Sequence, residues 1–247
     1  VVKIVVEQAR GRIAVLGSST APGTREVIEL TRYHKDIGCD GVMIMPPFMV
    51  RLNKDDLFHH YKAVSDAVET PIMLYNLPSD IVNDLTPDMV NRLADLKCVV
   101  AIKDSSFDFN IFWRLQCLVS DRIRVMIGPS TMFGAAAVQH GCEGWVDTYS
   151  NLWPELTVEL FQTAKAGEMK RALVLQKTAS DFRRFLSQAD WNMYCAVKAA
   201  MNCVGLPGGY PRLPLRALVE PHIGVIRQGM KQFGVPGAGT RLATAAE

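Results

Sequence analysis

PIMLYN at residues 71–76 and VVAIKD at residues 99–104 are short apolar runs that each end in polar residues. Between them lies an amphipathic stretch, Pro87–Leu96, which the capping residue Thr86 precedes. Short apolar strands that alternate with helices are typical of βαβ units, and such units build a parallel sheet. The two runs therefore predict neighbouring strands of an α/β protein.

The same alternation extends on both sides of these runs. Its six predicted strands are Arg12–Gly17, Gly41–Pro46, Pro71–Asn76, Val99–Asp104, Arg124–Gly128 and Gly144–Tyr149. The other helices predicted between strands are Thr24–Ile37, Lys54–Ala67, Asn110–Val119 and Met132–His140. After the sixth strand the pattern becomes helical, with helices expected at Pro154–Ala166, Met169–Leu186 and Asn192–Cys203. A Pro/Gly-rich stretch (Leu206–Leu215), one more amphipathic segment and a polar tail (Gly237–Glu247) follow.

This pattern divides the chain into a partial barrel at residues 1–153 and a helical region with a tail at residues 154–247. Six βα units fall short of an eight-stranded barrel. Two architectures stay open at this point: an open doubly wound sheet, and a barrel whose first two units lie outside this chain. The sequence contains neither G-x-G-x-x-G nor G-x-x-x-x-G-K-[ST], which disfavours a dinucleotide or P-loop site.

The composition favours a globular protein that acts on small molecules. Of the 247 residues, 49% are hydrophobic and 21% are charged, and the formal net charge is +2. Such a balance predicts no nucleic-acid or anionic membrane surface, and the longest uncharged stretch is too polar to span a bilayer. Six cysteines lie at unrelated spacings without a C-x-x-C pair, so we expect reduced thiols and a cytoplasmic protein.

Lys103 and Tyr75 each occupy the fifth position of a predicted strand. Because side chains alternate along a strand, Lys103 shares a face with Val99 and Ala101. We therefore expect its side chain to point into a dry interior. Burial lowers the pKa of a lysine, and a neutral amine can form a Schiff base with a carbonyl. Tyr75, one strand away at about 4.8 Å, is placed to act as a general acid and base. The competing interpretations are purely structural: Lys103 reaches solvent or pairs with Asp104, and the Tyr75 hydroxyl is satisfied near the surface.

YNLP (Tyr75–Pro78) followed by IKDSS (Ile102–Ser106) resembles the dihydrodipicolinate synthase/N-acetylneuraminate lyase family of class I aldolases. The resemblance covers nearly the whole chain and implies a (β/α)₈ TIM barrel with a C-terminal helical extension, usually in a tetramer. Further matches, in the family's order, are MPPF (Met45–Phe48), the strand end at Gly128, GWVDTYSN (Gly144–Asn151), Lys198, Gly205, Leu206, Arg212 and Pro214.

The resemblance also implies site residues. Lys103 would form the Schiff base with pyruvate or another 2-oxo acid, and Tyr75 would shuttle the proton. Gly128 and Val146 would lie around the bound acid.

The chain departs from the family at several positions. The family has two βα units before Arg12–Gly17, the second with a Gly-Thr-Thr type motif that binds the substrate carboxylate; nothing here matches it, so we expect a longer natural chain. Phe48-Met49 replaces a second tyrosine of the synthase branch. Asp80 stands where that branch has an arginine, and its charge argues against an anionic aldehyde substrate. Asp147 and Tyr149, where the family has smaller residues, either read substrate hydroxyls or fill space.

The sequence therefore predicts a lyase of aldolase or dehydratase type that acts on a small-molecule 2-oxo acid. We expect a cytoplasmic homo-oligomer, a tetramer, with no cofactor and no metal ion. Dihydrodipicolinate synthase proper stays open as an alternative, as does a non-catalytic 2-oxo-acid-binding barrel. A metal-dependent aldolase is disfavoured because the histidines do not converge in the predicted fold; they are His34, His59, His60, His140 and His222.

Overall fold

The structure, a computed structural model, describes residues 1–188 and 191–238. The chain divides into two compact units. The sheet unit comprises Val1–Pro129 and His140–Val146, and the helical unit comprises Ser130–Gln139 and the chain from Asp147 onward. None of the helices in the described stretches is both long enough and apolar enough to cross a membrane.

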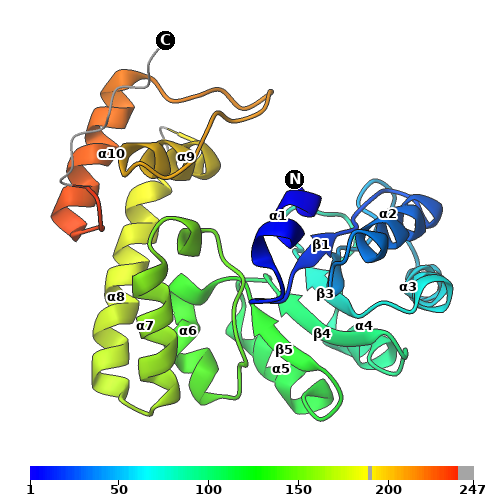
Figure 1. Cartoon of the computed structure of the whole chain (residues 1–247). Helices are drawn as coiled ribbons and strands as arrows, with labels where there is room; N and C mark the ends of the chain where they lie inside the picture. Colours follow the sequence, from blue (N-terminus) through cyan, green and yellow to red (C-terminus); the bar gives the residue numbers. More distant parts are fainter. Residues whose placement is uncertain (189–190, 239–247) are drawn as a thin grey trace. The chain divides into compact units, whose positions relative to one another are not determined.

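The described part of the sheet unit contains five strands, all parallel, in the order of the chain (Figure 1). In a doubly wound sheet the strand order reverses at a switch point, whereas consecutive order belongs to the wall of a (β/α)₈ barrel. The topology therefore excludes the doubly wound alternative for this sheet. The strands are β1 (Leu16–Ser18), β2 (Gly41–Ile44), β3 (Ile72–Asn76), β4 (Val99–Asp104) and β5 (Arg124–Ile127).

One helix follows each of the first four strands, and within this set of four each helix packs against its neighbour in the chain (Figure 1). Capping explains where some of them begin. The Thr86 hydroxyl accepts a hydrogen bond from the Met89 N–H with Pro87 at the first helical position, as the sequence predicts. These helices are α2 (Thr24–Asp36), α3 (Lys54–Val68), α4 (Pro87–Leu93) and α5 (Phe109–Val119).

The start of the chain differs from the prediction. Val2–Ala9 forms a helix, α1, that the sequence reading missed. The guanidinium of Arg12 donates to the backbone carbonyl of Gln8 at 2.8 Å and to that of Ala9 at 3.1 Å. Arg12 thus closes the end of α1, and β1 begins at Leu16 rather than at Arg12.

The predicted sixth strand, Gly144–Tyr149, is wrong. Its only ladder contact in the described chain is a single parallel bridge between Ile127 and Trp145. Further on, the Asp147 carboxylate accepts a hydrogen bond from the Ser150 N–H at 2.8 Å, which turns the chain into a 3₁₀ helix, η1 (Tyr149–Asn151). A local side-chain bond therefore replaces strand pairing.

The helical unit confirms the three helices predicted after residue 153. An aromatic and aliphatic core that includes Tyr149, Phe182 and Ile226 holds it together. The predicted polar tail lies outside the described residues from position 239, and the division at residue 153 stays a prediction. The elements are α6 (Ser130–Gln139, kinked at Phe133), η1, α7 (Pro154–Lys165), α8 (Met169–Leu186), α9 (Met193–Cys203) and α10 (Glu220–Phe233).

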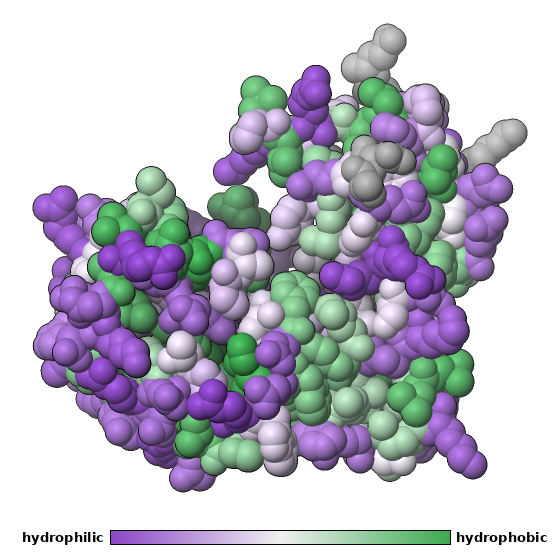
Figure 2. Space-filling view, turned by 180° about the vertical axis from the view of Figure 1, so that it is seen from behind, coloured by the Kyte–Doolittle hydropathy of each residue, from purple (hydrophilic) through white to green (hydrophobic). Residues whose placement is uncertain are grey.

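Apolar side chains also reach the surface of both units. In the helical unit, Val158, Leu173 and Val174 are each more than half exposed. Figure 2 shows apolar groups of side chains set among hydrophilic ones on one face of the molecule. Exposed apolar residues of this kind are common in globular proteins and carry no functional conclusion by themselves.

Candidate active site

The ends of β3 and β4 bring Tyr75 and Lys103 together. The two residues are direct partners in the parallel ladder. Lys103 is only 8% exposed, and its Nζ lies 3.9 Å from the centre of the Tyr75 ring. An amine held against an aromatic face inside a sheet is shielded from bulk water, which is the setting that Schiff-base chemistry requires.

A bulge in the sheet contributes to this alignment. Ile72 pairs with Val99, but the next partner of β3, Met73, pairs with Ala101, so Val100 is the extra residue. From that point the register runs on regularly to Tyr75 and Lys103. The bulge therefore shifts β4 by one residue, and without it Tyr75 would face Ile102.

Gly128, the predicted strand-end glycine, lies directly behind the lysine. A Cβ atom at this position would collide with the Ser105 hydroxyl and would lie 3.3 Å from Lys103 Cε. The Gly128 N–H donates to the backbone carbonyl of Asp104 at 2.8 Å, which ties the end of β5 to β4. Glycine is thus required here because two side chains of the site occupy the space of a Cβ.

Asp104, the residue after Lys103, has polar side-chain partners of its own. Its side chain is fully buried and accepts hydrogen bonds from Asn76 Nδ2 at 2.8 Å and Ser106 Oγ at 2.6 Å. Burial raises the pKa of the Asp104 carboxyl, and these two hydrogen bonds oppose that shift. The sequence reading did not single out Asn76 or Ser106; the only available signal was their position beside Tyr75 and Lys103 at the strand ends.

The structure places two further predicted residues of the sheet unit near its surface. Val146 is 41% exposed, and its N–H donates to the Ile127 carbonyl at 3.0 Å. Asp80 is exposed in the loop after β3, where it accepts a hydrogen bond from the Ser79 hydroxyl at 3.0 Å. Their predicted roles in substrate binding stay predictions.

Asp147 and Tyr149 belong to the helical unit and have partners there. The Asp147 carboxylate accepts hydrogen bonds from the Ser130 hydroxyl and from both the N–H and the hydroxyl of Ser150. The Tyr149 hydroxyl lies 3.2 Å from the Ser187 hydroxyl, and its ring packs in the core. Burial raises the pKa of Tyr149. Both side chains thus have structural partners, and their part in substrate recognition stays a prediction.

Similar sequences among known proteins identify the family of this chain. Residues 1–232 match the Dihydrodipicolinate synthetase family. The chain belongs to that family. A curated relative, the 4-hydroxy-tetrahydrodipicolinate synthase of Alkalilimnicola ehrlichii, is 35% identical over 95% of this chain and 79% of its own length.

Two solved structures show the same fold. The chloride-inhibited dihydrodipicolinate synthase of Acinetobacter baumannii, complexed with pyruvate, superposes with a TM-score of 0.87 at 29% identity, over 95% of this chain and 80% of that chain. The Aquifex aeolicus dihydrodipicolinate synthase superposes with a TM-score of 0.86 at 25% identity and the same coverage. The predicted class, a lyase of this family built on a (β/α)₈ barrel, is confirmed.

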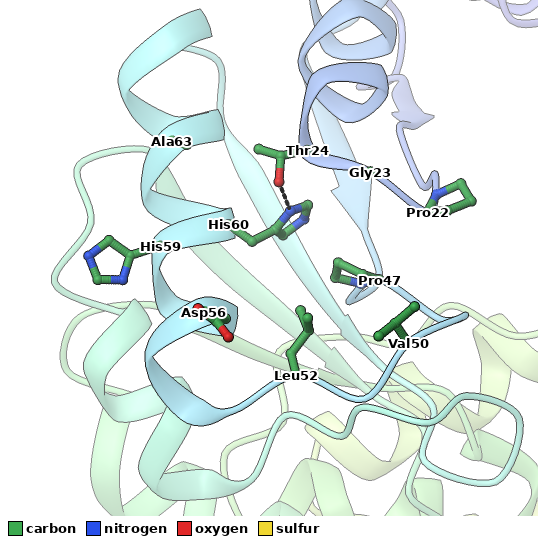
Figure 3. A pocket seen from close by; sticks show the side chains of 10 residues that line it. All are labelled: Pro22, Gly23, Thr24, Pro47, Val50, Leu52, Asp56, His59, His60 and Ala63. Atoms are coloured by element: carbon green, nitrogen blue, oxygen red, sulfur yellow. Dashed lines mark hydrogen bonds between the residues drawn. The ribbon is translucent and has the colours of Figure 1, made fainter.

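This family member also has a pocket of about 330 Å³ in the sheet unit, lined by the start of α2 and the chain before it, the loop between β2 and α3, and α3 (Figure 3). His60 lines it and is only 4% exposed; its Nδ1 lies 2.9 Å from the Thr24 hydroxyl (Figure 3). Within the described stretches, His60 Nε2 has no hydrogen-bond partner. Burial lowers the pKa of His60 to about 4, so the ring is neutral at pH 7. Neither Lys103 nor Tyr75 lines this pocket.

The chain offers few groups for a metal. Across residues 1–188 and 191–238, no cluster of three or more His, Cys, Asp or Glu side chains is arranged to hold a metal ion. The six cysteines are free thiols.

Proposed function

We propose that Lys103 forms a Schiff base with the keto group of pyruvate or another 2-oxo acid. The observation that carries the proposal is the buried amine: Lys103 is 8% exposed, and its Nζ lies 3.9 Å from the centre of the Tyr75 ring. Family membership supports it as well, since the Acinetobacter baumannii relative is described as a complex with pyruvate.

In the proposed reaction the neutral Lys103 amine adds to the keto carbon, and the resulting carbinolamine takes up a proton on its hydroxyl group and loses water to give a protonated imine. The positive nitrogen withdraws electrons from the carbon next to the imine carbon. A carbon–hydrogen or carbon–carbon bond at that position can then break, and its electron pair stays behind in an enamine. The Tyr75 hydroxyl, next to the amine, would carry the proton to or from the reacting carbon or oxygen.

The proposal extends to the other predicted residues. Gly128 and Val146 would lie around the bound acid, and Asp80 would contact the second substrate and disfavour an anionic one. Asp147 and Tyr149 would bind hydroxyl groups of the substrate. The barrel at residues 1–153 would carry the chemistry, with the helical region at 154–247 as its extension. A cytoplasmic homo-tetramer is part of the same proposal; the six free thiols support a reducing compartment. Light scattering on the purified protein would measure the oligomeric state.

The aldehyde substrate distinguishes the proposed lyase from dihydrodipicolinate synthase proper. An anionic aldehyde would meet the negative charge of Asp80, which disfavours binding. The name of the Alkalilimnicola ehrlichii relative supports the synthase alternative. Parallel assays with an aldehyde that bears a carboxylate and with neutral sugar-type aldehydes would separate the two, since the synthase reading requires turnover of the anionic aldehyde.

Reductive trapping tests the Schiff base directly. The protein is incubated with pyruvate and sodium borohydride, and the reduced adduct is located by peptide mass spectrometry. We expect a single modified peptide that contains Lys103, no adduct in Lys103→Met, and an unchanged adduct in Lys97→Ala, which alters an exposed lysine nearby in the sequence. The absence of an adduct on Lys103 in the wild-type protein would overturn the proposal.

Turnover then separates an enzyme from a non-catalytic binding barrel. Formation of an enamine exchanges the methyl hydrogens of pyruvate with solvent. In heavy water an enzyme would deuterate pyruvate catalytically, which NMR detects. A barrel that only binds the acid would form the adduct without such exchange.

A further inference from the structure

A second pair lies one residue beyond Tyr75 and Lys103, on the opposite face of the same two strands. Asn76 follows Tyr75 and Asp104 follows Lys103, and the two are also direct partners in the ladder. Because side chains alternate along a strand, this pair points away from the face that carries the amine and the phenol. Asn76 is 2% exposed and Asp104 is fully buried.

The side chains of this second pair are bonded across the strands. Asn76 Nδ2 donates to Asp104 Oδ1 at 2.8 Å, and the Ser106 hydroxyl donates to Asp104 Oδ2 at 2.6 Å. Asn76 Oδ1 in turn accepts from the Leu85 N–H at 2.9 Å. Both of these side chains are neutral donors to the carboxylate, which suits an ionised, acceptor-only group at position 104.

A charge held in this way is an unfavourable choice for stability alone. Desolvation of a carboxylate costs several kcal/mol, and apolar residues of similar volume often stabilise a core as well or better. The same desolvation raises the pKa of the Asp104 carboxyl. A buried polar pair does, however, discriminate between alignments of two strands, because a slip by one residue separates the donor from its acceptor.

The alignment of β3 with β4 needs such discrimination. The bulge at Val100 interrupts the ladder near its start, so the backbone pairing has an irregularity just before the site. The Asn76–Asp104 bond lies at the other end of the same ladder, one residue beyond Tyr75 and Lys103. The backbone bond from the Ser105 N–H to the Asn76 carbonyl, at 2.8 Å, continues the same alignment.

We propose that Asn76 and Asp104 are positioning residues, whose side-chain hydrogen bond holds β3 and β4 in the register that places Tyr75 against Lys103. This inference rests on the proposed Schiff-base function, because the pair acts through the amine and the phenol. Neither residue contacts the substrate in this role.

An exchange of the two side chains provides the test. Asn76→Asp alone sets two carboxylates against each other, and Asp104→Asn alone places an amide N–H₂ opposite a donor, either Asn76 Nδ2 or the Ser106 hydroxyl. The double variant N76D/D104N reverses the bond: the carboxylate at 76 accepts from the amide at 104 and from the Leu85 N–H, and the amide oxygen at 104 accepts from Ser106. Each single variant breaks the arrangement, and the double variant restores it.

The readouts are pyruvate methyl exchange in heavy water, borohydride trapping on Lys103 and the melting temperature. We expect each single variant to lower kcat for exchange by about 10²-fold with little change in KM, because exchange needs Tyr75 and Lys103 correctly aligned. Trapping should persist, and the double variant should recover most of the lost exchange. Asn83→Ala is the matched control: Asn83 is a buried asparagine of the same unit with side-chain bonds to Pro47, Val50 and Leu52.

Two results would overturn the inference. One is a loss of exchange in the single variants that is no larger than the loss in Asn83→Ala for the same decrease in melting temperature. The other is a double variant whose effects are the sum of the single ones, in exchange or in melting temperature. Failure of the proposed function looks different: the wild-type protein would then show no adduct on Lys103, while the coupling between Asn76 and Asp104 in melting temperature would still be decided by the double-mutant cycle.

Discussion

Tyr75 in the sheet unit and Tyr149 in the helical unit are both candidate site tyrosines, but their surroundings differ. Tyr75 lies at the end of a strand with an amine 3.9 Å from its ring centre. Tyr149 lies in a helical core, with its hydroxyl bonded to Ser187 and its ring against Phe182. The contrast teaches that a tyrosine becomes a candidate for proton transfer through what faces it, whereas burial by itself gives a structural residue.

The largest expected effect concerns Tyr75, the tyrosine of the sheet unit. Tyr75→Phe removes the hydroxyl and keeps the ring against Lys103. We expect kcat for pyruvate exchange to fall by about 10²–10⁴-fold, because general acid–base catalysis contributes a factor of that size. Borohydride trapping should continue on Lys103. An exchange rate equal to that of the wild type would assign the proton transfer to another group.

A second prediction concerns His60, a buried base of the sheet unit. Burial lowers the pKa of His60 to about 4, while the unfolded chain has the usual value near 6.5. Between about pH 6.5 and pH 4 the His60 ring is therefore protonated in the unfolded state and neutral in the folded state. Stability should fall as the pH drops through this window, by roughly 3 kcal/mol in total.

Urea titrations between pH 7 and pH 4 measure this loss. His60→Gln should reduce the loss, with a remainder from His34, whose pKa burial also lowers, and the exposed His59→Gln should leave the curve unchanged. An equally steep curve in His60→Gln would place the titrating group elsewhere.

Gly128→Ala tests how closely the site is packed behind Lys103. The added methyl group would collide with the Ser105 hydroxyl and press on Lys103 Cε. Overpacking of this kind costs about 1–3 kcal/mol of stability, and we expect trapping on Lys103 to slow as well. Gly224→Ala is the control, since a Cβ there meets nothing within 4 Å; in the middle of α10 it should stabilise the protein slightly. Equal effects of the two substitutions would contradict the packing argument.

The smallest expected effect concerns the helical unit. Tyr149→Phe removes the hydroxyl that bonds to Ser187 and leaves the ring in its core. We expect a loss of about 1 kcal/mol in stability, the usual value for one hydrogen bond. Pyruvate exchange should stay at the wild-type rate, because pyruvate has no hydroxyl for Tyr149 to read. A fall in exchange comparable with that of Tyr75→Phe would remove the distinction between the two tyrosines.

Much of the fold follows from local patterns. The helix at Pro87 begins where Thr86 and Pro87 predict it, because a capping bond and a preset φ angle involve only neighbouring residues. The strand Val99–Asp104 matches its prediction to the residue. Prediction failed at Gly144–Tyr149, where the bond of Asp147 to Ser150 outweighs the strand propensity of the apolar residues before it.

The sequence indicates two of the candidate site residues but not the residues that position them. Lys103 and Tyr75 stood out because polar side chains at equivalent positions of two apolar strands are uncommon. Asn76 and Asp104 did not stand out, although they are the next residues in each strand. Their bond depends on which residues face each other across the ladder, and that information is absent from either strand alone.

The sequence by itself thus determined where five strands lie, that the sheet is parallel and which two strand ends carry an amine and a phenol. Apolar periodicity, capping and the family motifs are properties of short stretches, so they can be read without coordinates. The tertiary structure decided the register, through the bulge at Val100 and the buried Asn76–Asp104 bond. Register is a relation between strands that are far apart in the chain, and a shift by one residue would turn Tyr75 away from the lysine.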